Sequence, residues 1–329
     1  MVNRDLLLKR AEELFDAGAV ERVLGWTNGE FSYDQSPAVF SNKEDLANFV
    51  YDAFCGANLS KYLIEQTRQK KKTAVFLKGC DTFSFNQLLN EKRINRDFVK
   101  PIVIGCEGKL DINKIKEKVE GVIENVSVEG NTVTIKTLDG TYTFDDKREF
   151  MLEKCLSCRG IAKVDDAEEI DIEHQFVSDG DRFSMVHKLE NMTEDERFAF
   201  WQAELSKCIR CNACRNVCPA CSCVKCVFDN DQSGVWTKAP ADSFEEQCFH
   251  IIRAFHVAGR CTDCGECSRV CPSHIPLHLL NRKFIKDSNS LYGEYQAGVE
   301  TDAVHPLIKY TEQDLDPTKA VAKTEGSNE

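Results

Sequence analysis

Hydrophobic and polar positions along the first half of the chain follow the pattern of an α/β domain. Apolar residues recur at helical spacing in residues 4–18, which end in glycine and predict an amphipathic helix. Residues 71–80 and 101–106 are short apolar runs that contain glycine at their ends, as expected for two buried strands. These patterns predict an N-terminal domain built on a sheet with helices packed against it.

Helices are expected directly after both strands. Asp81 is the predicted N-cap of a helix over residues 81–92, and Asp111 that of a helix over residues 111–121. A strand, a helix and a second strand of these lengths predict a right-handed crossover between parallel strands. Alternating residues 126–144, interrupted by two glycine-containing turns, predict a β-meander.

Beyond residue 180 the pattern becomes helical. Thr193 and Glu196 have the spacing of a capping box in front of a helix over residues 196–207. The predicted fold is thus an α/β N-terminal domain with parallel strands and a β-meander, followed by a helix-rich domain and a polar tail. The predicted boundaries are 1–180, 181–285 and 286–329.

Composition narrows the function and the compartment. The formal net charge of −12 argues against nucleic acid as a partner. No apolar run reaches the roughly 18–20 residues of a membrane span, and the charged N-terminus lacks the pattern of a signal peptide. Without a secretory signal, 17 cysteines indicate metal binding in the cytoplasm and not a disulfide framework.

Two cysteine motifs carry the most specific signal in the chain. The pattern C-x2-C-x2-C-x3-C-P begins at Cys208 and again at Cys261, and is typical of two-cluster ferredoxins. In this pattern the fourth cysteine ligates the cluster of the other motif, and zinc sites use paired C-x2-C motifs instead. One [4Fe–4S] cluster is therefore assigned to Cys208, Cys211, Cys214 and Cys271, and the second to Cys261, Cys264, Cys267 and Cys218.

Four other cysteines are predicted to meet at one edge of the sheet. Cys80 and Cys106 each follow a predicted parallel strand, so both emerge at the carboxyl edge, where α/β sheets bind ligands. Cys155 and Cys158 form a C-x2-C motif just after the meander. These thiols either hold a third metal centre or are buried structural cysteines.

The order of these motifs resembles the β-subunit family of deazaflavin-reducing hydrogenases and formate dehydrogenases. The resemblance covers about residues 30–160 and rests on NLSKYL, VFLKGCD, VIGCEG and CLSC, in that order. It implies a third [4Fe–4S] cluster on Cys80, Cys106, Cys155 and Cys158. The ferredoxin-like region resembles domains found on formate dehydrogenase members of the same family.

The resemblance also implies FAD, with Ser60, Lys61 and Tyr62 as cofactor-binding residues. The chain departs from the family at this site. The family has a glycine pair in an early loop, whereas residues 12–26 contain only the isolated glycines 18 and 25. After the C-x2-C motif the family continues with an alanine-rich acidic stretch, which is RGIAKVDDAEEI here.

Three further cysteines are surplus to the ferredoxin motif. Cys221, Cys223 and Cys226 are too dense for core packing and indicate zinc or a further cluster. The fourth ligand is open: Cys248, a histidine, or a cysteine assigned elsewhere. A rival grouping places Cys155 and Cys158 with Cys223 and Cys226 in a four-thiolate zinc site.

These observations predict an iron–sulfur electron-transfer subunit without catalytic residues of its own. Its expected partners are subunits of a cytoplasmic formate dehydrogenase, hydrogenase or heterodisulfide-reductase complex, and soluble ferredoxin. The alternative is a flavin-dependent subunit that passes electrons from a deazaflavin or NAD(P)H to ferredoxin. A redox sensor is a third class, which no DNA-binding motif supports.

Overall fold

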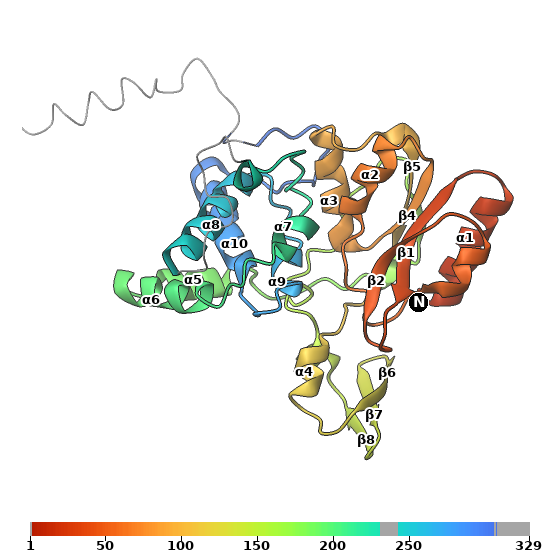
Figure 1. Ribbon diagram of the computed structural model, residues 1–329, viewed down its shortest axis with the longest axis horizontal. Coiled ribbons are helices and arrows are strands. Elements are labelled where there is room, and N and C mark those ends of the chain that lie inside the picture. Colours follow the sequence, from red (N-terminus) through yellow and green to blue (C-terminus); the bar gives the residue numbers. More distant parts are fainter. Residues whose placement is uncertain (1, 231–242, 306, 308–329) are drawn as a thin grey trace, which may run out of the picture.

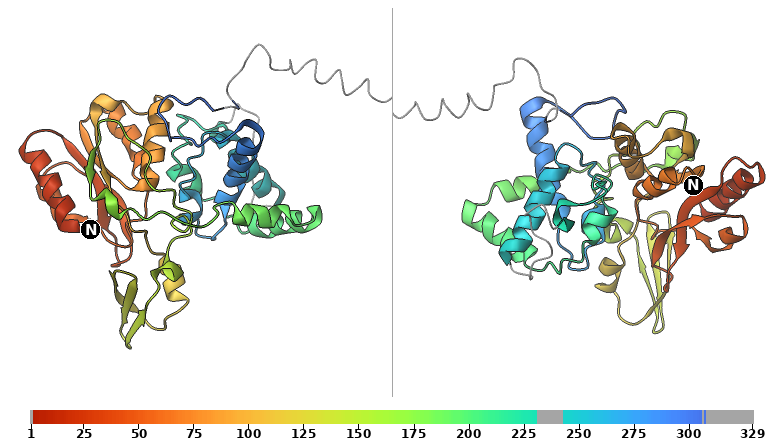
Figure 2. Two further views of the ribbon diagram at one scale, coloured as in Figure 1. Left: turned by 180° about the vertical axis from the view of Figure 1, so that it is seen from behind. Right: turned by 45° about the horizontal axis from the view of Figure 1, so that its top comes forward.

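A computed structural model describes residues 2–230, 243–305 and 307. An α/β domain and a helical region that carries both ferredoxin motifs lie side by side (Figure 1). A small three-stranded lobe projects from the α/β domain, and the same arrangement is seen from behind and from above (Figure 2). Among the described residues, no helix has the length and apolarity needed to cross a membrane.

The central sheet has the strand order β2–β1–β4–β5–β9, and β3 pairs with β1. β1, β4, β5 and β9 are parallel to one another, whereas β2 and β3 are antiparallel to β1. The strands are β1 (Arg22–Asn28), β2 (Gln35–Phe40), β3 (Phe49–Val50), β4 (Thr73–Leu77), β5 (Val99–Ile104) and β9 (Glu168–Ile170). The parallel pairing of β4 with β5 across the intervening helix confirms the predicted parallel strands.

Helices surround this sheet and form most of the second region. They are α1 (Arg4–Asp16), α2 (Leu63–Arg68), α3 (Gly79–Asn90), α4 (Ile112–Lys116), α5 (Ser184–Glu190), α6 (Glu194–Leu205), α7 (Ala213–Val217), α8 (Ser243–Val257), α9 (Glu266–Arg269) and α10 (Leu277–Tyr292). Short 3₁₀ turns are η1 (Glu44–Asn48), η2 (Ser60–Tyr62), η3 (Arg96–Phe98), η4 (Lys147–Phe150), η5 (Ile172–His174) and η6 (Val227–Asp229).

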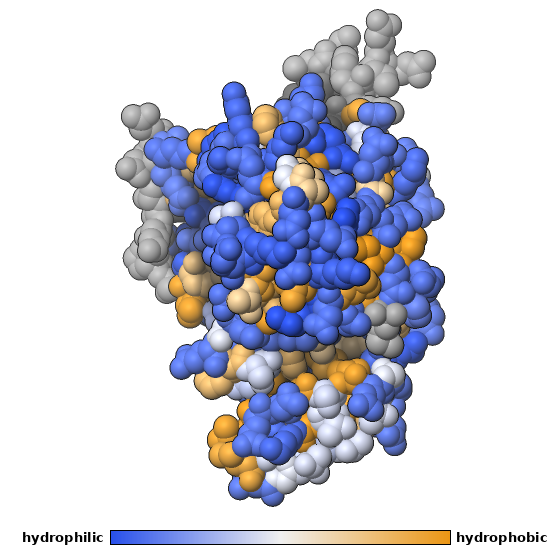
Figure 3. Space-filling view, turned by 90° about the vertical axis from the view of Figure 1, so that its right-hand side faces the viewer, coloured by the Kyte–Doolittle hydropathy of each residue, from blue (hydrophilic) through white to orange (hydrophobic). Residues whose placement is uncertain are grey.

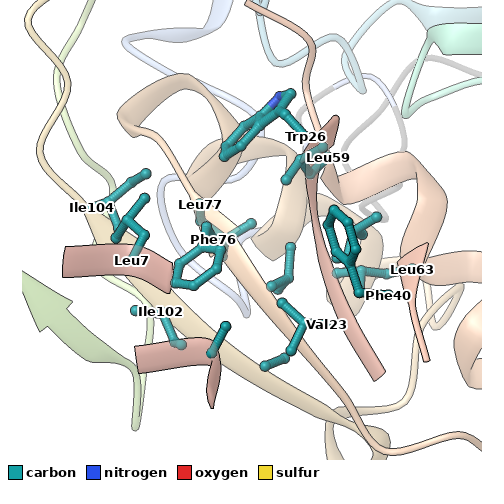
Figure 4. Packing of buried hydrophobic residues seen from close by; sticks show 14 of the residues in the cluster. Leu7, Val23, Trp26, Phe40, Leu59, Leu63, Phe76, Leu77, Ile102 and Ile104 are labelled. Carbon is teal, nitrogen blue, oxygen red and sulfur yellow. The ribbon is translucent and has the colours of Figure 1, made fainter. Parts of the chain in front are cut away.

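The core of the α/β domain lies between the sheet and its helices (Figure 4). Every residue of β4 is buried, which explains why this strand is continuously apolar in the sequence and not alternating. The rings of Phe49 and Phe76 lie 5.7 Å apart, and α1 contributes Leu7 and Leu14. This packing holds the carboxyl ends of β4 and β5 in a fixed position.

The start of α3 differs from the prediction. Lys78, not Asp81, is the N-cap residue, because the chain leaves β4 in an extended conformation only as far as Lys78. Asp81 is the third helical residue, where its carboxylate accepts hydrogen bonds from the backbone N–H (3.2 Å) and Nζ (2.9 Å) of Lys78. Asp111 and the Thr193–Glu196 capping box occupy their predicted positions.

The predicted β-meander is the projecting lobe, with β6 (Ile123–Glu129), β7 (Thr132–Thr137) and β8 (Thr141–Phe144) in antiparallel order. It has its own hydrophobic cluster around Val133, Ile135 and Phe150. Hydrophobic residues also gather on the lower part of the surface in Figure 3, which is otherwise largely hydrophilic.

In the helical region α7 packs against α9, and α10 packs against both α8 and α9. α10 continues to Tyr292 and therefore crosses residue 285, where the sequence predicted the tail to begin. Half of that tail, residues 308–329, lies outside the described residues.

The buried ion pair at the start of α3 gives a stability prediction. The side chains of Lys78 and Asp81 are 1% and 0% exposed, and Lys78 Nζ also donates to the Ala57 carbonyl. Lys78→Met leaves the Asp81 carboxylate buried without its cation, so the free energy of unfolding is expected to fall by about 3–5 kcal/mol. Chemical denaturation measures this loss.

The matched control is Lys71→Met, which removes an exposed ion pair with Glu21. This substitution is expected to leave the denaturation midpoint almost unchanged. Equal destabilisation by the two substitutions would contradict the role given to the buried pair.

Candidate functional site

The two ferredoxin motifs have the same backbone conformation. Two residues in each motif are left-handed at matching positions: Arg210 and Asn212 (φ 54° and 62°), and Asp263 and Gly265 (φ 56° and 67°). A short helix, α7 or α9, begins directly after the second of these residues. Left-handed conformations are unfavourable for most residues, so their repetition indicates that both loops are built to direct three cysteines inward.

The eight ferredoxin cysteines lie in two neighbouring groups. The first thiol group is Cys208, Cys211, Cys214 and Cys271, and the second thiol group is Cys218, Cys261, Cys264 and Cys267. In the first thiol group, burial raises the pKa of Cys214, with Cys271 and Cys211 as close negative neighbours, and Cys214 in turn acts on Cys208. In the second thiol group, burial raises the pKa of Cys261, Cys264 and Cys267, and the charge of Cys218 adds to each shift. The two groups adjoin, because Cys214 also interacts with Cys218 and Cys267, so the assignment of each cysteine to one cluster stays a prediction.

The four remaining predicted cysteines meet at the carboxyl edge of the sheet. Cys80 lies in the first turn of α3, after β4, and Cys106 lies just after the neighbouring strand β5. Burial raises the pKa of Cys155 to about 11, with contributions from Cys106 and Cys158. Burial also raises the pKa of Cys80, to which the charge of Cys158 contributes. We call these four residues the sheet-edge group.

Backbone N–H groups approach the sulfurs of the sheet-edge group. The N–H of Lys109 donates to the sulfur of Cys155 (3.3 Å), and that of Gly160 donates to the sulfur of Cys158 (3.4 Å). Such donors stabilise a thiolate more than a thiol. These donors therefore favour the thiolate form of Cys155 and Cys158, in opposition to burial.

The spacing of the thiols is wider than that of a single-ion site. Four sulfurs around one Zn²⁺ lie about 3.8 Å apart, given tetrahedral geometry and Zn–S of about 2.3 Å. Among the described residues, no three cysteine sulfurs lie within 4.8 Å of one another. This spacing favours the larger cubane over a zinc ion in each group.

A buried ion triad joins the sheet-edge group to the second thiol group. Lys154 Nζ contacts the carboxylate of Glu266 and donates to the Gly56 carbonyl, and Arg269 binds Glu266 at 2.8–2.9 Å. Burial raises the pKa of both Cys80 and Cys264, and the charge of Lys154 opposes this shift at both thiols, so one ammonium acts on both groups. The sequence analysis missed this residue, since nothing in its local pattern marks it.

Tight packing supports the triad. A side chain at Gly265 would meet Lys154 Cβ at 2.5 Å. Gly265 therefore serves two purposes, because its positive φ shapes the second motif and its lack of a side chain admits Lys154.

Ser60, Lys61 and Tyr62 form η2, but their side chains serve different contacts. Ser60 is fully buried and donates to a backbone carbonyl of the α/β domain. Lys61 Nζ donates to the carbonyl oxygens of Cys218 (3.1 Å) and Cys221, so it bridges to the ferredoxin motif. Tyr62 is exposed. The three side chains do not converge on one cavity.

Cys221, Cys223 and Cys226 line a cavity beside the second thiol group. The Cys221 thiol is hydrogen-bonded to that of Cys218, and Cys223 is exposed. The charged neighbours of this segment include Lys61 and Arg260, whereas those of Cys155 and Cys158 include Lys154. The geometry thus gives no support to a shared zinc site for Cys155, Cys158, Cys223 and Cys226.

Comparisons with known proteins bear on the ferredoxin motifs and on the family of the chain. Residues 204–275, which contain both ferredoxin motifs, match the family described as 4Fe-4S dicluster domain.

The relatives include two β subunits from methanogens. The chain is 26% identical over 355 aligned residues to the F420-dependent formate dehydrogenase subunit beta of Methanocaldococcus jannaschii, which covers 90% of this chain and 91% of the relative. It is 24% identical over 350 residues to the F420-dependent formate dehydrogenase 1 subunit beta of Methanococcus maripaludis, with 88% and 89% covered.

Among solved structures, a chain of the F420-reducing [NiFe] hydrogenase complex from Methanosarcina barkeri matches with a TM-score of 0.38 and 15% identity. That match covers 47% of this chain and 59% of the other, and is too weak to define the fold. The relatives aligned along almost the whole chain, together with the dicluster match, confirm the predicted family. Along about nine-tenths of its length the chain is therefore similar to β subunits of F420-dependent formate dehydrogenases, and it carries a 4Fe–4S ferredoxin-like domain.

Proposed function

We propose that this protein is an iron–sulfur electron-transfer subunit that relays electrons between partner subunits of a cytoplasmic oxidoreductase complex. The observation that carries the proposal is that a buried cation lies between cysteines of neighbouring predicted groups. Lys154 acts on Cys80 and Cys264, and Arg253 acts on Cys214 and Cys267. Each group would hold one [4Fe–4S] cluster, and such clusters supply one-electron transfer when bound.

The order of the groups follows from the cations between them. Lys154 acts on the sheet-edge group and on the second thiol group. Arg253 is 4% exposed and acts on Cys214 of the first group and Cys267 of the second. We infer a linear path from the sheet edge through the second group to the first.

The chain's own residues insulate the sulfurs and offset their charge. Burial disfavours thiolates and raises the pKa of Cys267 to about 12, while Arg253 acts in the opposite direction. Bound iron and nearby cations together would permit deprotonation of thiols that burial alone would keep neutral.

The partners follow from the relatives. Those relatives are named as subunits of F420-dependent formate dehydrogenases. A catalytic subunit of a formate dehydrogenase or hydrogenase is thus the partner we propose for one end of the path, with another redox subunit or a soluble ferredoxin at the other. A reducing cytoplasm fits a chain with 17 cysteines.

We do not include FAD in the proposed function. A cavity of about 200 Å³ lies at the carboxyl end of β5, lined in part by Tyr51, Gly105 and Lys109. Pockets for drug-sized ligands measure about 300–1,000 Å³, so this cavity is small for a dinucleotide. A larger cavity of about 510 Å³ is lined by Lys61 but not by Ser60 or Tyr62. In addition, Ser60 and Lys61 already bind backbone carbonyls. A flavin spectrum in the protein's acid supernatant would instead support the flavin-dependent alternative.

Iron content tests the sheet-edge group. In the anaerobically purified full chain, Cys80→Ala combined with Cys158→Ala is expected to remove about four irons and as many acid-labile sulfides, because one cubane loses two ligands. The control is Cys55→Ala, since Cys55 is fully buried and its thiol has a pKa raised by burial to about 12. This control is expected to retain all iron.

Two results would overturn the assignment. Unchanged iron in the double variant would remove the sheet-edge cluster from the proposal, and loss of one zinc instead would identify the site as zinc. Fewer than about eight irons in the unmodified chain would refute the two-cluster ferredoxin core itself.

Redox titration tests the role of Lys154. Lys154→Gln keeps a hydrogen-bond donor but removes a positive charge that favours reduction of both neighbouring clusters. A unit charge several ångströms away at an effective dielectric constant of about 20 amounts to about 1.4–2.8 kcal/mol, so both potentials are expected to fall by about 60–120 mV. Electron paramagnetic resonance during the titration follows each cluster.

The matched control for this titration is Lys114→Gln, which removes a half-buried lysine paired with Glu153. Its potentials are expected to stay at the values of the unmodified chain. A Lys154→Gln variant that shifts only one cluster, or neither, would contradict the proposed position of Lys154 between the two groups.

A further inference from the structure

Cys221, Cys223 and Cys226 lie on the wall of a cavity of about 510 Å³. The cavity is bounded by the segment that follows the first ferredoxin motif and by α8. The cavity is distinct from the first and second thiol groups, although Cys221 lies next to Cys218 of the second thiol group. Three thiols in such a space are more than core packing requires.

Positive side chains dominate the wall of this cavity. The cations that line it are Lys61, Arg215, Lys225, Arg253 and Arg260. The lining contains one carboxylate, Asp229, which is paired with Arg215 at 2.8 Å, and Arg260 is paired with Glu91, which lies outside the lining. In a chain with a net charge of −12, this concentration of cations favours a negatively charged occupant.

Arg253 provides a second, independent indication of an occupant. Its side chain is 4% exposed, and one terminal nitrogen donates to the Cys214 carbonyl at 3.0 Å. Its Nε has no hydrogen-bond partner among the described residues. A buried donor without a partner costs about 1–3 kcal/mol, so such groups in native proteins usually face a ligand, an ion or water.

The spacing and volume favour a cluster over a single ion. The three sulfurs are not within 4.8 Å of one another, whereas sulfurs bound to one Zn²⁺ lie about 3.8 Å apart. An iron–sulfur cluster with three thiolate ligands carries negative charge that the surrounding arginines and lysines would offset. The cavity is also far larger than one ion requires.

We propose that Cys221, Cys223 and Cys226 hold an additional [4Fe–4S] cluster in this cation-lined cavity, adjacent to the cluster of the second thiol group. The inference rests on the proposed function, because it adds a branch to the electron path at Cys218. Within the described residues no fourth cysteine lines the cavity, so the fourth iron would need a ligand other than a cysteine; His256 and Asp229 also line the cavity. A one-electron exchange with the second cluster oxidises one of the two and reduces the other, without movement of atoms.

The test compares metal content in the full chain purified without oxygen. The unmodified chain is expected to hold about sixteen irons, and Cys223→Ala is expected to lower this to about twelve with an equal loss of sulfide. Cys223 is exposed, so its replacement removes little packing. Cys226→Ala is a second variant that should give the same loss.

Cys248→Ala is the matched control, since Cys248 lies on α8 but is not part of the cavity wall. It is expected to retain about sixteen irons. Spin quantification of the dithionite-reduced protein provides a second readout: Cys223→Ala should lose one cluster signal and leave the others unchanged.

Several outcomes would overturn this inference while sparing the proposed function. One is an unmodified chain with about twelve irons, of which the sheet-edge variant still loses about four. Another is unchanged iron but loss of one zinc in Cys223→Ala, which would make the site a zinc site. A third is unchanged iron and zinc in both cysteine variants, which would mean that the cavity holds no metal.

Discussion

Lys154, Glu266 and Arg269 meet where the α/β domain contacts the ferredoxin-like region, and the arrangement of the thiol groups depends on their contact. The side chains of Lys154 and Glu266 are 4% and 2% exposed, so their charges are nearly removed from water. Such a pair is tolerated only when its remaining hydrogen bonds are satisfied. Here Lys154 also donates to the Gly56 carbonyl, and Glu266 also accepts from Arg269. Because these partners come from both regions, the triad fixes the sheet-edge group relative to the second thiol group.

The same requirement for charge compensation recurs around the other cysteines. The chain as a whole is acidic, but Arg253 is buried among thiols of the first and second groups, and Lys61 binds carbonyls next to Cys218. Thiolates in a low-dielectric interior need nearby cations or N–H donors to remain charged. The positive charges of Arg253 and Lys61 therefore belong to the thiol sites, whereas the net negative charge is that of the chain as a whole.

Local patterns predicted elements more reliably than their boundaries or their partners. The buried strand β4, the meander and the Thr193 capping box were predicted, because periodicity and capping depend on neighbouring residues. The helix after β4 starts earlier than predicted, since Lys78 completes the extended segment and its ammonium binds Asp81. The short strands β3 and β9 were missed, because so few residues give no measurable alternation.

The sequence alone determined the two ferredoxin motifs, their exchange of fourth cysteines as a prediction, and the family, because ligand spacing and motif order are local properties. The sequence predicted that Cys80 and Cys106 meet Cys155 and Cys158, but only the tertiary structure decided which backbone donors and cations surround their sulfurs. It also decided that Lys154 contacts Glu266, and that cations surround the cavity at Cys221. These contacts join residues far apart in the chain, and they form only when the sheet, the loops and the helices pack together.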